Sequence, residues 1–166
     1  MGTDMWVPGH VTTLLAIDPG ATSGWARFHG EVLDDAGKFD FVAVEGIDFS
    51  LPQSNLYCGG QLVIEIPRVY PRSGKGDPND IIELAMKAGE IRGYYRHLGM
   101  KVREVYPRTW KGTVPKDVHG ARVLAALTDI ERSLLEKVKV TKTNANGYNH
   151  NELDAVGLGL WHLKRM

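Results

Sequence analysis

The stretch that most constrains the fold runs from Leu14 to Phe28, LLAIDPGATSGWARF, where an apolar run ends in a carboxylate and a glycine-rich turn. Val11–Ile17 is apolar and contains no breaker, which predicts a strand buried on both faces. Asp18 should be its last residue, because Pro19 cannot donate to a ladder and the following glycines permit a sharp turn. A second strand is expected over 25–28. The stretch thus places a carboxylate at the rim of a core, although Asp-Pro-Gly is also typical of an ordinary hairpin turn.

Length and composition favour one self-sufficient domain. At 166 residues the chain can bury most of its apolar surface without disulfide or metal staples. Cys58 is the sole cysteine, which excludes an intrachain disulfide and suits a reducing compartment. We find no signal peptide and no apolar run long enough to cross a bilayer, so a cytoplasmic protein is expected. Residues 1–10 lack periodicity and are expected to be a poorly ordered lead-in to a single domain over 11–166.

The charge is unevenly distributed along the chain even though the net charge is zero. The first 67 residues hold 2 basic and 9 acidic side chains, whereas residues 68–116 hold 11 basic and 5 acidic ones. A basic middle in a neutral protein indicates a local anion-binding surface rather than a polycationic coat. Scattered solvated charge is the plainer alternative.

A second carboxylate is expected at another strand end. Gly30–Lys38 has the composition of a polar turn, and Phe39–Val44 alternates as a third strand would. Gln61–Ile66, QLVIEI, predicts a short apolar strand that carries Glu65 near its end, directly before Pro67. A buried glutamate needs a partner, which can be an arginine in a plain salt bridge, a hydrogen-bond donor or a metal ion.

A basic loop separates this strand from the longest predicted helix. Residues 67–78 concentrate proline, glycine and cations around Tyr70, which is typical of a mobile arm rather than a core element. The helical pattern begins at a cap, Asn79 or Asp80, and ends at Gly99. One side of this helix is nearly bare because Ala85, Gly89 and Gly93 fall four residues apart. A second helix or the protein's own sheet can approach that side closely.

The chain then returns as a strand over Lys101–Tyr106 and enters a basic loop over Pro107–Pro115. Strand, helix and strand in this order predict a βαβ crossover, which makes the two strands parallel. Residues 116–139 predict one or two helices, and residues 140–149 predict a polar loop.

The third carboxylate lies on the last predicted helix, Asn151–Leu163. Asp154 is one turn into this helix, with His150 at i−4 and Asn151 at i−3, so all three can point the same way. A surface aspartate near a helix N-terminus is also common, since the helix dipole stabilises it. If the strand ends and this helix meet, however, three carboxylates share one rim, and divalent cations would resolve their repulsion.

The motifs IDPGATSGWA, LVIEIP, YPRTWKGTVPKD and NELDAVGLGLWHL, in this order around a long helix, resemble the RuvC-type Holliday junction resolvases of the RNase H-like nuclease superfamily, phage versions in particular. The resemblance covers nearly the whole chain from Leu14. It implies an α/β, RNase H-like fold whose mixed five-stranded sheet joins an antiparallel three-strand meander to parallel strands and is flanked by helices. It also implies a crossover junction endodeoxyribonuclease that acts in DNA recombination and repair in a bacterial host or phage-infected cell.

The matching positions imply that Asp18, Glu65 and Asp154 are catalytic carboxylates holding two Mg²⁺ or Mn²⁺ ions, about 3.5 to 4 Å apart, for phosphodiester hydrolysis. The family places a fourth ligand three residues before the final aspartate, where this chain has Asn151, with His150 one place earlier. Asn151 offers a carbonyl oxygen but is also a strong N-cap. We therefore expect His150 to be the fourth ligand or a proton-transfer group, with Asn151 as a cap and the alternative ligand.

The resemblance also implies contacts to branched DNA. Lys111 and Lys116 match DNA-contacting lysines, and Tyr70 is the candidate for an aromatic wedge at the junction. The full set of candidates for DNA binding is Arg68, Tyr70, Arg72, Lys75, Arg108, Lys111 and Lys116. Shape rather than base edges would select four-way junctions. Symmetric cleavage needs two active sites, so a homodimer is implied, with the bare side of the long helix as its interface.

Three other functions fit parts of the sequence. A nuclease for flaps and other branched DNAs would use the same residues, and a DNA-binding module without catalysis would share the fold. The turn with Thr22 and Ser23 also resembles the phosphate-binding hairpin of actin and sugar-kinase ATPases, although that fold needs about twice this length.

Overall fold

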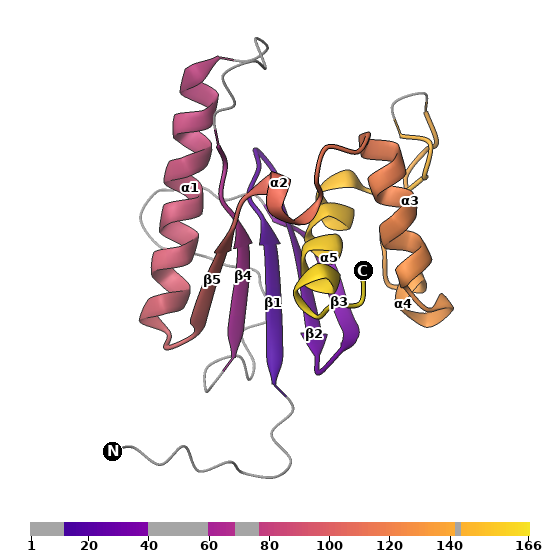
Figure 1. Cartoon of the computed structure of the whole chain (residues 1–166), viewed down its shortest axis with the longest axis horizontal. Helices are drawn as coiled ribbons and strands as arrows, with labels where there is room; N and C mark the ends of the chain where they lie inside the picture. The colour runs from indigo at the N-terminus through magenta and orange to yellow at the C-terminus, as the bar shows by residue number, and fades with distance from the viewer. Residues whose placement is uncertain (1–11, 40–59, 69–76, 142–143) are drawn as a thin grey trace.

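The computed structural model describes residues 12–39, 60–68, 77–141 and 144–166, which form a sheet with helices on both faces (Figure 1). The strands are β1 (Thr13–Asp18), β2 (Ser23–His29), β3 (Val32–Phe39), β4 (Gln61–Glu65) and β5 (Lys101–Val105). They lie in the order β3-β2-β1-β4-β5. The first three pair as an antiparallel meander, and β1, β4 and β5 run parallel. This order and these directions confirm the predicted RNase H-like α/β fold.

The helices occupy different faces of this sheet. They are α1 (Pro78–His97), α2 (Pro107–Trp110), α3 (Lys116–Ala126), α4 (Asp129–Ser133) and α5 (His150–His162). In Figure 1, α1 lies beside β5 at one side of the molecule, α5 lies in front of the sheet, and α3 and α4 lie beyond α5. No helix within the described ranges is long and apolar enough to cross a membrane.

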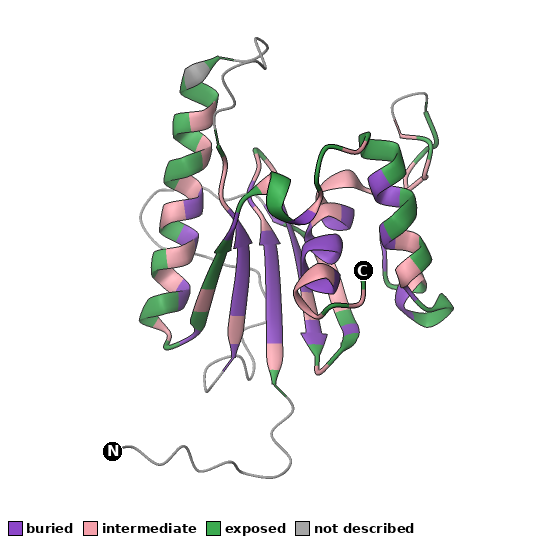
Figure 2. Ribbon diagram, in the orientation of Figure 1, coloured by how far each residue is buried: buried purple, intermediate pink, exposed green. Residues whose placement is uncertain are grey.

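Strand β1 is buried on both faces, as its apolar run predicts (Figure 2). Leu15 and Ile17 pack with α1 in one core cluster, whereas Leu14 and Ala16 pack with α5 in the other. The alternation is that of a strand, whose successive side chains point to opposite faces. Asp18 continues the second series, so its carboxylate is directed to the face that α5 covers.

The third strand differs from the prediction. The expected turn over Gly30–Lys38 is only two residues long, with Gly30 at a φ of 59°, and β3 begins at Val32. The polar residues that favoured a long turn lie instead on an edge strand, where Asp34 accepts a hydrogen bond from Arg27. An edge strand exposes one side to water, so its polar composition is no obstacle to pairing. Residues 40–44 of the predicted strand lie outside the described residues.

Helix α1 begins and packs slightly differently from the prediction. Its N-cap is Asp77, whose carboxylate accepts from the backbone N–H of Asn79, so neither of the predicted caps is correct. The chain leaves the helix at Gly99, with a φ of 80°, as predicted. Its buried residues are Ala88, Ile91 and Tyr95, which meet the sheet. The bare side therefore faces away from the sheet, and no atom lies within 4 Å of a Cβ built at Gly89 or Gly93.

Helix α5 starts one residue earlier than expected. Asn149 is its N-cap and accepts from the backbone N–H groups of Asn151 and Glu152. The first turn lies directly on β2, because a Cβ at Gly24 would collide with the carbonyl of Asn151. Gly24 is also the residue paired with Asp18 across the β1–β2 ladder. This close approach brings the start of α5, and with it Asp154, to the end of β1.

The predicted loop over Pro107–Pro115 contains the short helix α2. Pro107 stands at its first position, where a missing N–H costs nothing. The turn buries Trp110 beneath it. This single turn fixes the position of the residues that follow it, beginning with Lys111.

Candidate active site

Two carboxylates end adjacent parallel strands at the same edge of the sheet. Ile17 of β1 pairs with Ile64 of β4, so Asp18 and Glu65 come next in register. Val63 packs in the same cluster as Leu14 and Ala16, which places Glu65 on the α5 face together with Asp18. Both carboxylates therefore lie where the start of α5 covers the sheet.

Asp18 lies close enough to Glu65 and Asp154 for both of their charges to act on it. Burial, with the adjacent charge of Glu65 next in effect, raises the pKa of Asp18 well above its ordinary value. The charge of Asp154 raises it further, and a hydrogen bond with Glu65 favours the protonated form. The three carboxylates thus repel one another in a partly dehydrated site.

Lys111 lies among these carboxylates. Its Nζ is 3.1 Å from Glu65 Oε2 and 3.4 Å from Asp154 Oδ2. Burial alone would lower the pKa of the lysine, but the charges of Asp18, Asp154 and Glu65 outweigh burial and raise it. Lys111 was predicted to contact DNA; in this structure its ammonium is the cation that balances the acidic cluster.

Trp110 holds Glu65 from the side. Its indole Nε1–H donates a 2.6 Å hydrogen bond to Glu65 Oε2, the same oxygen that Lys111 contacts. The indole also meets the ring of His119 edge to face, with centroids 4.9 Å apart. Trp110 therefore links the end of β4 to α3 and orients the glutamate without adding charge.

His119 is a member of the site that no sequence pattern indicates. The residue is 3% exposed, and its Nε2 has no hydrogen-bond partner among the described residues. Nε2 lies 3.9 Å from Asp154 Oδ1. Burial lowers the pKa of the imidazole, and the charge of Asp154 opposes this shift. In sequence, His119 resembles any core residue of an amphipathic helix, because only the packing of α3 on α5 brings it to Asp154.

The residues expected to supply a fourth ligand lie in the first turn of α5. His150 is its first residue and is half-buried. Asn151 Nδ2 donates to the carbonyl of Thr22 at 2.8 Å. The expectation that Asn151 caps the helix is thus wrong, because Asn149 caps it and Asn151 instead ties the helix to the turn after β1.

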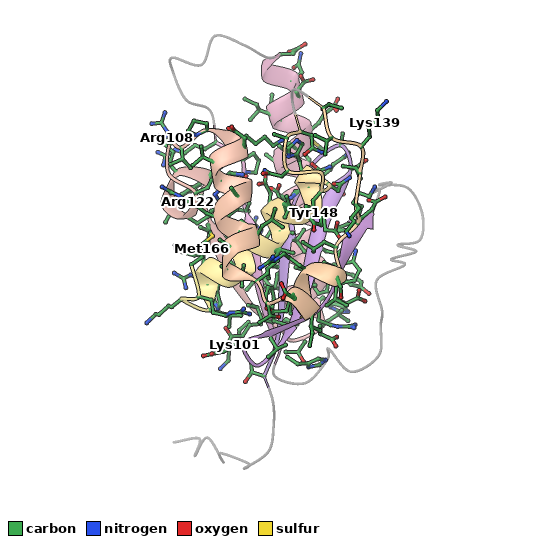
Figure 3. The ribbon with its side chains drawn as sticks, turned by 90° about the vertical axis from the view of Figure 1, so that its right-hand side faces the viewer. Lys101, Arg108, Arg122, Lys139, Tyr148 and Met166 are labelled. Carbon is green, nitrogen blue, oxygen red and sulfur yellow. The ribbon has the colours of Figure 1, made fainter. Side chains whose placement is uncertain are left out.

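An open cavity of about 480 Å³ lies beside the cluster, and three of the basic residues predicted to contact DNA line it. Arg108, Lys111 and Lys116 line it together with His119 and Asp154. A second hollow of about 490 Å³ also borders Lys111 and His119 and is lined in part by Arg122. Arg108 and Arg122 project from the same side of the molecule (Figure 3). Arg122 therefore extends the basic surface beyond the predicted residues.

The loop after β4 is described only at its start. Arg68 is exposed, and its guanidinium lies 5.0 Å from the centroid of the Tyr106 ring. The predicted DNA contacts Tyr70, Arg72 and Lys75 lie outside the described residues.

The donor chemistry of the cluster suits a divalent cation. No group of three or more histidine, cysteine, aspartate or glutamate side chains in the described ranges is arranged to hold a metal ion in this conformation. The cation among the carboxylates is Lys111. Carboxylate oxygens are nevertheless the ligand atoms that Mg²⁺ and Mn²⁺ prefer. The Nε2 of His119 is buried without a hydrogen-bond partner among the described residues, so it is available as a nitrogen ligand. Asp18, Glu65, Asp154 and His119 therefore fit such an ion once Lys111 moves aside.

The chain combines an RNase H-like fold with an acidic cluster at the carboxyl ends of its parallel strands. No family model and no curated protein matches the sequence. Among solved structures, RuvC of Thermus thermophilus is 14% identical with a TM-score of 0.47, covering 91% of this chain and 93% of that one. T. thermophilus RuvC in complex with a Holliday junction substrate is also 14% identical, with a TM-score of 0.45 and coverages of 91% and 92%. Strand order and directions, rather than these likenesses, establish the fold.

Proposed function

We propose that the protein is a metal-dependent endonuclease that resolves four-way DNA junctions as a homodimer. The observation that carries this proposal is the meeting of Asp18, Glu65 and Asp154 around the ammonium of Lys111, beside a cavity lined by basic residues. An acidic cluster with little solvent access costs stability, and the raised pKa of Asp18 within it is typical of a functional site. A basic rim beside it suits a phosphate backbone.

Two Mg²⁺ or Mn²⁺ ions held by the three carboxylates would supply an activated water and stabilise the leaving oxygen. The side chains of the chain itself prepare the site for this chemistry. Trp110 fixes one oxygen of Glu65, which leaves the other oxygen for a cation. Lys111 stabilises the cluster between turnovers, and on moving to the cavity that it also lines it can pair with a DNA phosphate.

The basic lining favours DNA as the substrate. Arg108, Lys111 and Lys116 line the cavity, and Arg122 lines the neighbouring hollow that also borders Lys111. Such contacts go to phosphates and fix position without reading bases. Selection of a four-way junction would then depend on its shape, which brings several backbones to one cationic surface.

The outward side of α1 supports a homodimer. Ile82 and Met86 are 57% and 62% exposed, and Gly89 and Gly93 continue the same line at spacings of three and four. A helix with this pattern can pack closely against a copy of itself. Met86→Glu should convert the dimer to a monomer in light scattering. Ile130→Glu should not, because Ile130, although 79% exposed, lies on α4 and not on this side of α1. A monomeric wild type would remove the dimer from the proposal.

The cleavage test uses end-labelled four-way junctions, flaps, forks and linear duplexes of the same sequence. Wild-type protein should cut the junction in Mg²⁺ or Mn²⁺ and should not cut it in EDTA. Equal cutting of flaps and forks would define a broader branched-DNA nuclease. Tight junction binding without cleavage in either metal would contradict the enzymatic proposal and leave a DNA-binding module.

A further inference from the structure

The imidazole of His119 is held in place on three sides. Trp110 meets it edge to face, and Val123, one turn further along α3, packs against Gly157 of α5. A Cβ built at Gly157 would lie 3.3 Å from His119 Nε2 and 3.1 Å from the Trp110 ring. The absence of a side chain at Gly157 therefore makes space for the imidazole. The ring is therefore packed in one orientation, with Nε2 turned toward α5.

The fourth side of the imidazole faces the acidic cluster. His119 Nε2 is 3.9 Å from Asp154 Oδ1, too far for a hydrogen bond, and both residues line the same cavity. A metal–ligand bond to nitrogen or oxygen measures about 2.1 Å. Two atoms 3.9 Å apart can therefore both contact a single ion. A nitrogen that only served packing would not be left buried and without a hydrogen-bond partner.

We propose that His119 Nε2 is the nitrogen ligand of the divalent-metal site, with Asp154 as its neighbouring oxygen ligand. This inference rests on the proposed metal-dependent function. It moves the fourth ligand from the first turn of α5, where His150 and Asn151 were expected, to α3. Asn151 is engaged with the carbonyl of Thr22 through its amide, which supports the change.

An imidazole ligand has a consequence for metal choice. Both Mg²⁺ and Mn²⁺ prefer oxygen ligands, but Mn²⁺, a transition ion, accepts an imidazole nitrogen more readily than Mg²⁺ does. Removal of the imidazole should therefore weaken Mn²⁺ binding much more than Mg²⁺ binding. Replacement of His119 by glutamine keeps a side chain of similar length and exchanges the nitrogen donor for an oxygen.

The test measures metal binding by the full-length protein without DNA. Pulsed electron paramagnetic resonance of bound Mn²⁺ detects the hyperfine coupling of a directly coordinated ¹⁴N, and a Mn²⁺ titration in the same samples yields the affinity. Wild type, His119→Gln, His150→Gln and His162→Gln are compared. His150→Gln is the matched control on the competing residue. His162→Gln is a control at the far end of α5, where that imidazole contacts Gln61.

The proposal predicts ¹⁴N coupling in wild type, in His150→Gln and in His162→Gln, and its loss in His119→Gln. Mn²⁺ affinity should fall about tenfold or more in His119→Gln, with a change in Mg²⁺ affinity of less than about threefold. Coupling that survives in His119→Gln and disappears in His150→Gln would overturn the assignment. Bound Mn²⁺ without any ¹⁴N coupling in wild type would also overturn it, while leaving the nuclease proposal standing. A wild type that binds no Mn²⁺ would overturn the metal site as well.

His119 is buried, so His119→Gln could fail to fold, which circular dichroism would reveal. In that case the test is made on the wild-type protein by NMR of the ring ¹⁵N resonances of its histidines. Zn²⁺, a diamagnetic ion that binds imidazole, should shift Nε2 of His119 and leave the ring nitrogens of His150 unchanged. A shift at His150 with none at His119 would contradict the proposal.

Discussion

Two buried acidic sites in this protein have opposite electrostatics. Glu131 of α4 is 2% exposed, and its carboxylate accepts from the Leu33 N–H, from both the N–H and the hydroxyl of Thr128, and from Arg165. These donors, with Arg165 first, lower the pKa of Glu131 to about 2. Burial and a like charge instead raise the pKa of Asp18.

This difference in pKa shift indicates a different role for each site. Glu131 joins α4, β3 and the C-terminal Arg165, and nearly every oxygen lone pair has a donor, so this carboxylate stabilises the fold. At the Asp18 cluster, the part of the chain that the structure describes places Lys111 against Glu65 and Asp154, and Trp110 donates to Glu65. The cluster is left short of positive charge at a cavity, which destabilises the apo fold and prepares the site to bind a cation.

The largest expected effect is on cleavage. Asp18→Asn, Glu65→Gln and Asp154→Asn should each slow junction cleavage by about 10³-fold or more, comparable with the loss of a major electrostatic stabiliser. Junction affinity should stay the same or improve, because each change removes a negative charge beside DNA. Gel-shift and cleavage assays on the same samples separate the two effects. Glu104→Gln, an exposed glutamate that pairs with Arg92 and Arg96, is the matched control. A fully active variant would remove that residue from the site.

The largest effect on stability is expected at Glu131. A pKa of about 2 against an ordinary value near 4.5 corresponds to about 3 kcal/mol of stability at neutral pH. Because the folded-state pKa is depressed, this contribution is present above pH 4.5 and is lost as the pH falls toward 2. Urea unfolding of wild type and Glu131→Gln should therefore differ by about 3 kcal/mol at pH 7 and converge at low pH. A difference that does not change with pH would mean that Glu131 contributes by packing alone.

The parts of the fold that follow from local pattern could be predicted from the sequence. The apolar run before Asp18, the QLVIE strand before Glu65 and the amphipathic helix around Asp154 each carry their own periodicity. The edge strand β3 could not be predicted in this way, because its exposed side tolerates the same polar residues as a turn.

The site was predictable only in its carboxylates. The position of Lys111 depends on the single turn of α2, and that of His119 depends on the room left by Gly157 of α5, far away in sequence. Such packing relations leave no periodic pattern in the chain. The capping role of Asn149 was missed for a smaller reason, since Asn149 and Asn151 lie two residues apart and both suit an N-cap.

A smaller effect is expected at Lys111. Lys111→Gln removes the cation that balances the cluster, so the melting temperature in EDTA should fall by about 3 to 6 °C, corresponding to about 1–2 kcal/mol. The same change should strengthen Mn²⁺ binding, because the ion no longer competes with an ammonium. Differential scanning fluorimetry with a Mn²⁺ titration measures both quantities. Weaker Mn²⁺ binding together with unchanged apo stability would place Lys111 outside the cluster in solution.

The smallest effect is expected on the basic rim. Lys116→Ala and Arg108→Ala should each weaken junction binding by roughly 1 kcal/mol and reduce the slope of log affinity against log salt by about one. Lys101→Ala, on the exposed end of β5 far from the cavity, is the control. Unchanged salt slopes in both rim variants would exclude a phosphate contact at the cavity.

The most direct test of the acidic cluster as a cation site is thermal unfolding of wild type, Asp18→Asn and Glu131→Gln with increasing Mn²⁺. At a hundredfold excess over its dissociation constant, an ion that binds only the folded state adds about 2.7 kcal/mol, or roughly 5–10 °C for a chain of this size. We expect this increment in wild type and in Glu131→Gln, and its loss in Asp18→Asn, whose melting temperature in EDTA should already exceed that of wild type. A wild type that does not respond to Mn²⁺, or an Asp18→Asn variant that responds equally, would contradict the assignment.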